Sequence, residues 1–265
     1  MSDGTPPPFE PDPPGSDPAP EPTPPEPVPP HPAGEGEPFW TYIDVAVFAG
    51  SALPCILLGV GIVKLFFWLL GWKTKDLALV AVPAQGIGYL LLFGVLYLMF
   101  RLYDRPFWRS LGWVVPQLSP VWVVSSGMGA AIVVVFVGNL IQTPNTENEI
   151  TRMMKDPASL AMMVVFGVLV APLCEELAFR GFLQPLLVRS FGIVPGVLGA
   201  AIPFGLLHYR EYGNSWRHAL LISLAGAAFG WMRQSTRSTL ASSLMHAAYN
   251  ALFFAAYFAT RGAAR

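Results

Sequence analysis

The chain has 265 residues, of which 53% are hydrophobic and only 12% are charged. Soluble domains carry roughly 25% charged residues, so this composition excludes an ordinary soluble globular protein. The net charge of −1 gives no overall positive field that would attract nucleic acid, and we expect the lipid bilayer, not nucleic acid, as a partner.

The first 37 residues differ sharply from the remainder of the chain. Residues 1–37 are rich in proline and acidic side chains and contain no lysine or arginine. Such a segment cannot bury enough apolar surface to offset the entropy lost on ordering. We therefore predict a disordered tail, partly in polyproline II conformation, whose Pro-x-x-Pro pieces leave a ligand role open.

From Trp40 onward the sequence consists mainly of long apolar runs. A membrane-spanning helix needs about 20 mostly apolar residues, so these runs predict an all-α, multi-pass transmembrane bundle of seven spans, or eight. The seven predicted spans are 40–63, 77–100, 121–141, 157–178, 191–209, 217–232 and 238–260. The shorter run 65–72 either extends the first span or lies in the membrane interface.

The spans fall into two groups. Residues 38–141 hold the N-terminal transmembrane helices, and residues 157–260 hold the polar residues that carry chemistry. Within the second group, Gly226 and Gly230 form a Gly-x-x-x-Gly motif in a short span, which predicts close helix packing.

Ionisable side chains inside membrane spans are costly and usually functional. In the C-terminal part they are accompanied by one arginine and one asparagine, and the six residues are Glu175, Glu176, Arg180, His208, His246 and Asn250.

The two adjacent glutamates differ in their local partners. Residues four apart share a helix face, so Glu176 can pair with Arg180 and keep both charges satisfied. Glu175 is rotated by about 100° on a helix and has no such partner. A poorly hydrated, unpaired carboxylate suits a general base. The alternative is that both acids merely end the helix at the water interface.

His246 and Asn250 are also four residues apart and share a face. Helix-borne groups from neighbouring spans can meet at one depth in a bundle. A carboxylate base, two imidazoles and a carboxamide can activate water and stabilise an oxyanion, which fits peptide hydrolysis. Glu175, His208 and His246 could instead ligate zinc, although the His-Glu-x-x-His signature is absent.

Three motifs occur in order on the apolar spans: Glu-Glu-x-x-x-Arg at 175–180, Phe-x-x-x-His at 204–208 and His-x-x-x-Asn at 246–250. Together they resemble the CPBP family (CAAX protease and bacteriocin-processing, or Abi) of intramembrane glutamic endopeptidases, which includes the Ras-converting CAAX prenyl endopeptidase. The resemblance covers about residues 157–260, which it implies to be the catalytic core.

By this resemblance, Glu175 is the base that activates water, and Glu176 and Arg180 support it. His208 helps to position or activate the water, and Phe204 is the supporting aromatic residue of the same motif. All positions of the three motifs match, so we expect an active member.

The resemblance further implies that His246 and Asn250 stabilise the oxyanion. Members of the family are described both as metalloproteases and as metal-free glutamate proteases. Because the chain has no compact metal motif, we expect no cofactor, with zinc on Glu175, His208 and His246 as the alternative.

The expected substrate is a membrane-associated peptide or protein, with lipid-modified proteins among the candidates. The expected location is the cell (plasma) membrane. Two other functions fit the same residues: a non-catalytic immunity or scaffold protein whose polar groups hold helices together, and a small transporter with a proton relay.

Overall fold

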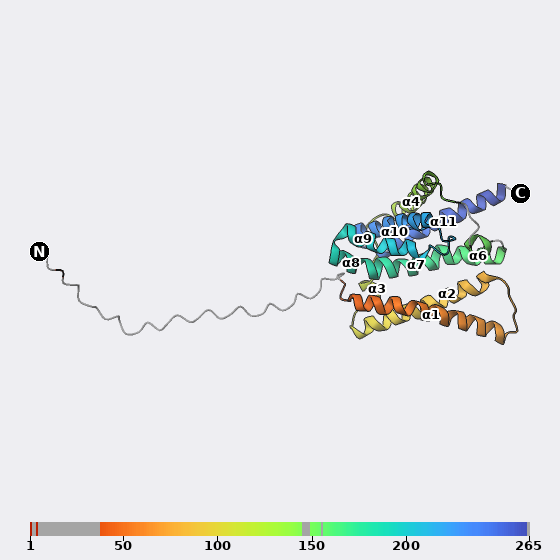
Figure 1. The fold of residues 1–265 in the computed structure, drawn as a ribbon, viewed down its shortest axis with the longest axis horizontal. Helices are drawn as coiled ribbons and strands as arrows, with labels where there is room; N and C mark the ends of the chain where they lie inside the picture. The colour runs from red at the N-terminus through yellow and green to blue at the C-terminus, as the bar shows by residue number, and fades with distance from the viewer. Residues whose placement is uncertain (2–3, 5–37, 145–148, 155, 264–265) are drawn as a thin grey trace. The chain divides into compact units, whose positions relative to one another are not determined.

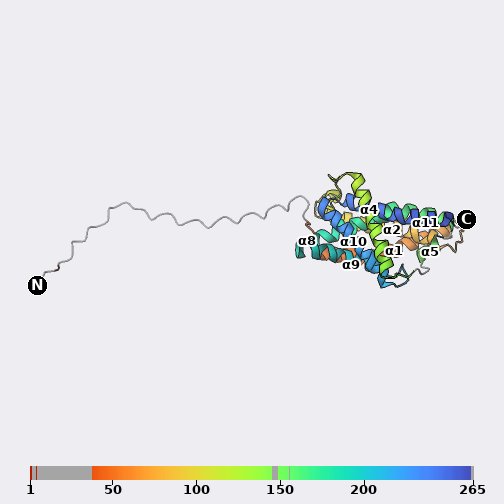
Figure 2. The ribbon, with the colours of Figure 1, turned by 90° about the horizontal axis from the view of Figure 1, so that it is seen from above.

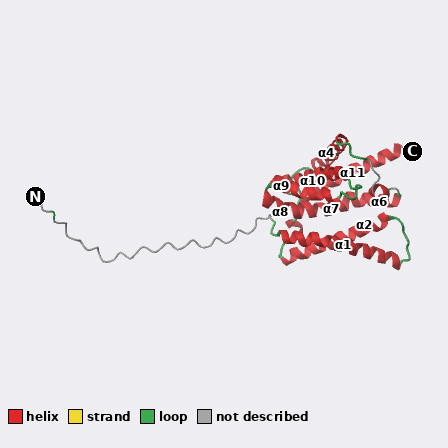
Figure 3. Cartoon of the chain, viewed as in Figure 1, coloured by secondary structure: helices red, strands yellow, loops and turns green. Residues whose placement is uncertain are grey.

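The computed structural model describes residues 1, 4, 38–144, 149–154 and 156–263. All regular structure in these residues is helical (Figure 3). The predicted all-α fold is therefore confirmed. The predicted disordered tail, 1–37, lies outside the described residues apart from positions 1 and 4.

Each of the seven predicted spans contains a helical segment. The segments are α1 (Tyr42–Leu69), α2 (Leu77–Leu102), α4 (Pro120–Leu140), a continuous segment Pro157–Phe191, α9 (Ile193–Leu207), α10 (Trp216–Thr236) and α11 (Thr239–Ala263). Two short helices that the sequence did not predict lie in the connections, α3 (Phe107–Ser110) and α5 (Glu149–Met153).

Within the described part of the chain, four segments are long and apolar enough to cross a membrane, namely α1, α2, α4 and the 35-residue segment Pro157–Phe191. Helix α9 is apolar but has only 15 residues. Helices α10 and α11 are long but less apolar, and α11 buries the polar side chains of Ser242, Ser243 and His246. Protein neighbours shield such groups from lipid.

The run 65–72 extends the first span, which was one of its two predicted roles. Helix α1 continues to Leu69 and ends in a turn at Gly71, whose φ of +65° suits glycine. Trp68 and Trp72 are exposed at this end. Exposed tryptophans at the end of a span are typical of the headgroup region.

The segment Pro157–Phe191 alternates between α-helix and wider π-helix. It comprises α6 (Pro157–Val165), η1 (Phe166–Val170), α7 (Ala171–Glu176), η2 (Leu177–Leu183) and α8 (Gln184–Phe191). The predicted end at residue 178 was wrong, since the helix continues to Phe191.

The two π-helical turns have an identifiable cause. Pro172 and Pro185 each follow a π-helical turn closely. A proline lacks the N–H that would bind the carbonyl four residues earlier, and widening the preceding turn lets the helix continue. The helix ends only at Gly192, where φ is +87°.

The helices pack in pairs around this broken segment. Helix α1 lies along α2, α9 along α10, and α4 against α11 (Figures 1 and 2). Helix α7 contacts α11, and α2 contacts α6. The segment 157–191 thus connects the α1–α2 pair with the C-terminal helices.

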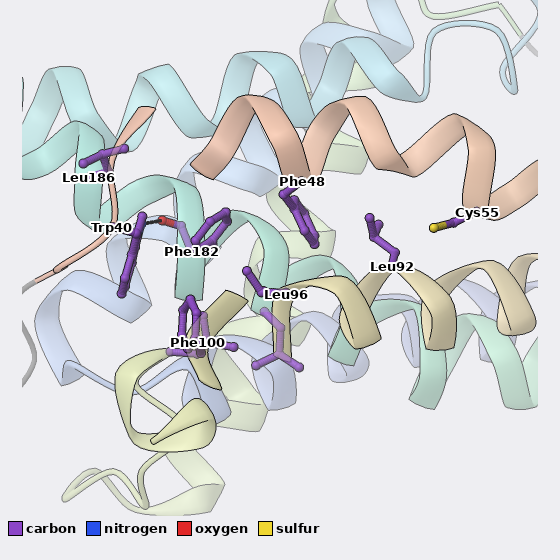
Figure 4. Close-up of a cluster of buried hydrophobic side chains, with 10 residues drawn as sticks. Trp40, Phe48, Cys55, Leu92, Leu96, Phe100, Phe182 and Leu186 are labelled. Atoms are coloured by element: carbon purple, nitrogen blue, oxygen red, sulfur yellow. Dashed lines mark hydrogen bonds between the residues drawn. The ribbon is translucent and has the colours of Figure 1, made fainter. Parts of the chain in front are cut away.

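An apolar cluster holds the α1–α2 pair against η2 and α8. It contains Trp40, Phe100 and Phe182, whose rings pack on one another (Figure 4). The indole Nε1 of Trp40 donates a hydrogen bond of 3.0 Å to the Phe182 carbonyl. A second cluster joins α4, α10 and α11, with Phe229 fully buried.

Two glycines of α4 give a matched test of this packing. A Cβ at Gly127 would lie 2.2 Å from the Met245 carbonyl oxygen of α11, whereas one at Gly129 would meet open space. We expect Gly127→Ala to lower the free energy of unfolding by about 1–3 kcal/mol, because the helices must separate. Gly129→Ala should leave it unchanged or slightly raised. Thermal unfolding of the two variants in detergent checks this, and equal melting temperatures would contradict it.

Candidate active site

Glu176 and Arg180 form a fully buried ion pair. Arg180 Nη1 lies 3.0 Å from Glu176 Oε1, and neither side chain is exposed. Arg180 Nη2 also donates a 2.8 Å hydrogen bond to the Gly226 carbonyl of α10. Its guanidinium lies 4.5 Å from the centre of the Phe204 ring, a cation–π contact that is stronger without water. The pair predicted from the four-residue spacing is present.

The Gly226–Gly230 motif accommodates polar side chains from the neighbouring helix. A Cβ at Gly226 would lie 3.0 Å from Arg180 Nη2, and one at Gly230 would lie 2.6 Å from Gln184 Oε1. Gln184 Nε2 donates a 2.9 Å hydrogen bond to the Gly230 carbonyl. The predicted close approach is real, and it gives Arg180 and Gln184 access to backbone carbonyls.

His246 lies between the two glutamates. Its Nδ1 is 3.0 Å from Glu176 Oε1 and its Nε2 is 3.9 Å from Glu175 Oε2. The ring stacks on Phe229 with centroids 4.4 Å apart. Because an ionised carboxylate only accepts hydrogen bonds, the Nδ1 contact requires an N–H at that atom. The contact therefore aims Nε2 at Glu175.

Glu175 differs from its neighbour in exposure. Its side chain is 17% exposed, whereas that of Glu176 is 0% exposed. Its Oε1 receives a long hydrogen bond, 3.5 Å, from the hydroxyl of Tyr89 in α2. Glu175 is thus partly accessible from outside the protein, while Glu176 is fully enclosed.

His208 reaches this group through Phe204. Its Nδ1 lies 2.8 Å from the Phe204 carbonyl, and the two rings have centroids 4.9 Å apart. The Phe204 ring in turn lies 5.8 Å from the His246 ring. The structure brings Glu175 and His246 together directly, and His208 and His246 each pack against the Phe204 ring.

Asn250 is tied to the first π-helical turn. Its Nδ2 donates a 2.7 Å hydrogen bond to the carbonyl of Gly167, which uses one of its two amide hydrogens. This bond connects α11 with η1, one turn of helix along α11 from His246.

The placed side chains do not form a ready metal site. In the described residues, no three His, Cys, Asp or Glu side chains come together as metal ligands. His246 Nδ1 is engaged by Glu176, and His208 Nδ1 by a carbonyl. The alternative zinc set of Glu175, His208 and His246 would require a rearrangement of these groups.

Tyr89 and its neighbour Gln85 were not among the predicted site residues. They lie on α2, in the N-terminal group of spans. The sequence did contain a signal for them, because both are polar positions, four residues apart, in a mainly apolar run. The other motifs were found by the same spacing. Only the tertiary structure brings this helix face to Glu175.

The buried pair predicts different stabilities for two one-atom changes. Glu176→Gln leaves Arg180 as an uncompensated buried charge, which costs roughly 3–5 kcal/mol. Arg180→Met should behave similarly because it leaves Glu176 buried without its cationic partner. Glu175→Gln, at a partly exposed position, should unfold within about 1 kcal/mol of the original protein. Thermal unfolding in detergent measures all three, and equal stabilities for the two Gln variants would contradict the assignment.

Comparison with known families agrees with this geometry. Residues 157–252 match the family model of type II CAAX prenyl endopeptidases of the Rce1-like kind. No curated protein and no solved structure matches the chain. The matched region begins with α6 and ends in α11 just after Asn250, so it includes all three motifs. Residues 157–252 are therefore similar to the Rce1-like type II CAAX prenyl endopeptidases, and the chain is an integral membrane protein.

Proposed function

We propose that the chain is an intramembrane endopeptidase in which Glu175 activates the water that cleaves the peptide bond. The observation that carries this proposal is the arrangement of Glu175, His246 and Glu176. One glutamate is partly exposed and the other is sealed, with a histidine held between them. A base must be reachable by water, and of the two glutamates Glu175 is the accessible one.

Glu176 has a supporting role in this proposal. Its Oε1 lies 3.0 Å from both Arg180 Nη1 and His246 Nδ1. Both contacts are made by the same carboxylate oxygen. It fixes the tautomer and orientation of the imidazole, so Nε2 of His246 points at Glu175.

The gap between Glu175 and His246 suits a water molecule. Nε2 and Oε2 are 3.9 Å apart, and both are acceptors when Nδ1 carries the proton of the neutral ring. A water can donate one hydrogen to each at about 2.8 Å. Its oxygen lone pairs are then left to face a peptide carbonyl.

The chemistry follows from that position. Glu175 takes a proton from the water while the water oxygen bonds to the carbonyl carbon. The C–N bond then breaks, and Glu175 returns the proton to the leaving nitrogen. We assign oxyanion stabilisation to the second amide hydrogen of Asn250, while His246, which the family resemblance paired with it in this role, accepts the other hydrogen of the water through Nε2. Nε2 of His208, whose Nδ1 is engaged by the Phe204 carbonyl, can accept a hydrogen bond from the substrate backbone.

An apolar groove supports a membrane-associated substrate. It has a volume of about 530 Å³ and is lined by Val82, Pro83, Gly86, Ala161, Met162, Val165, Phe166 and Val170. The Phe166 ring stacks on Tyr89, whose hydroxyl meets Glu175. The groove therefore borders the site, and we propose that it holds an apolar or lipid-modified part of the substrate in the plasma membrane.

The decisive experiment is cleavage of a peptide library, with and without lipid modification, by the purified full chain in detergent. Glu175→Gln should abolish turnover and leave substrate affinity nearly unchanged, because the base acts only in the chemical step. A Glu175→Gln protein that cleaves normally would refute the mechanism. If the unmodified chain binds peptides without cleaving them, the scaffold function is favoured instead.

The zinc alternative predicts a different outcome in the same assay. A Glu175-activated water should tolerate EDTA and 1,10-phenanthroline, and the purified protein should hold no stoichiometric zinc. Zinc at one equivalent that disappears in His208→Ala or His246→Ala would overturn the metal-free mechanism and make these histidines ligands.

Two glycines on α2 allow a matched test of the groove. Gly86 lines it, and a Cβ there would meet only Phe166, at 3.9 Å. Gly94, on the same helix, faces open space. We expect Gly86→Leu to fill the groove and raise KM for apolar or lipid-modified peptides by roughly tenfold, with kcat nearly unchanged. Gly94→Leu should have no effect, and a similar KM in both variants would rule out the groove as a substrate site.

A further inference from the structure

Tyr89 contributes to the candidate site from outside the family match. It lies on α2, whereas the match covers residues 157–252. Its hydroxyl is 3.5 Å from Glu175 Oε1, across 86 positions of sequence. Hydrogen bonds at active sites are often long without substrate and shorten when it binds.

Gln85 fixes the direction of this hydrogen bond. Gln85 Nε2 lies 3.0 Å from the Tyr89 hydroxyl, and an amide nitrogen can only donate. The Tyr89 oxygen therefore accepts from Gln85, and its own hydrogen is available for Glu175. Successive bonds of this kind polarise one another, which strengthens the tyrosine as a donor.

The ring of Tyr89 is held in place independently of these hydrogen bonds. It stacks on Phe166 with centroids 6.1 Å apart and an interplanar angle of 6°. Phe166 begins η1, and the next residue, Gly167, accepts the hydrogen bond from Asn250. The same π-helical turn thus contacts both Tyr89 and Asn250.

We infer that Tyr89 is a positioning residue for Glu175, with Gln85 behind it. Tyr89 holds Oε1, and this orients Oε2 toward His246 Nε2, where the proposed water binds. One carboxylate oxygen is thereby held by α2, and the other faces α11 across the proposed water. This inference rests on the proposed function, because it assigns Tyr89 a role through the proposed base.

The test compares kcat and KM for peptide cleavage by the full chain in detergent. Tyr89→Phe keeps the ring and removes only the hydroxyl. We expect kcat to fall roughly 10- to 100-fold, the effect of losing one hydrogen bond to a charged group, with KM within about twofold. Tyr97→Phe is the matched control on the same helix, because Tyr97 is 46% exposed and packs on Phe107. It should retain full activity.

A second variant keeps the test valid if Tyr89→Phe unfolds. Gln85→Met has a similar shape and removes the donor behind Tyr89, so kcat should fall by roughly 2- to 10-fold at unchanged KM. The positioning role would be overturned if Tyr89→Phe had the same kcat as the unmodified protein, or only a higher KM. Glu175-dependent cleavage would still stand in that case. Absence of Glu175-dependent cleavage in the original protein would overturn the proposed function, and this inference with it.

Discussion

The buried ion pair of Glu176 and Arg180 sets the arrangement of the C-terminal helices. An unpaired charge in a dry interior costs several kcal/mol, so each partner must lie within contact distance of the other. Arg180 also needs the Gly226 carbonyl and the Phe204 ring, which belong to α10 and α9. Glu176 also binds His246 on α11. From α7 and η2, one pair thus contacts all three of these helices.

Local spacing predicted much of this structure because the relevant interactions lie within single helices. Long apolar runs indicated the positions of all seven helical segments, and the four-residue spacing indicated the Glu176–Arg180 pair. The end of the 157–178 span was wrong for a physical reason. Pro172 would ordinarily disrupt a helix, but the preceding π-helical turn removes the need for its missing N–H, and the helix continues.

Contacts between helices could not be predicted in the same way. The spacing of Gly226 and Gly230 indicated a close approach, but it could not show that Arg180 and Gln184 occupy the space. Nor could it show Tyr89 beside Glu175. Pairs of residues on different spans depend on helix rotation and on the widening of the π-helical turns, and neither is encoded in a four-residue repeat.

The adjacency of the two glutamates has a consequence for how their contributions combine. Two neighbouring carboxylates repel unless each has its own partners, and helix α7 separates them by about 100°. Glu176 faces Arg180, Glu175 faces the partly exposed side, and His246 contacts both. A change at Glu176 therefore alters the imidazole that Glu175 faces. The two residues share one network, so the effects of changing them should not add.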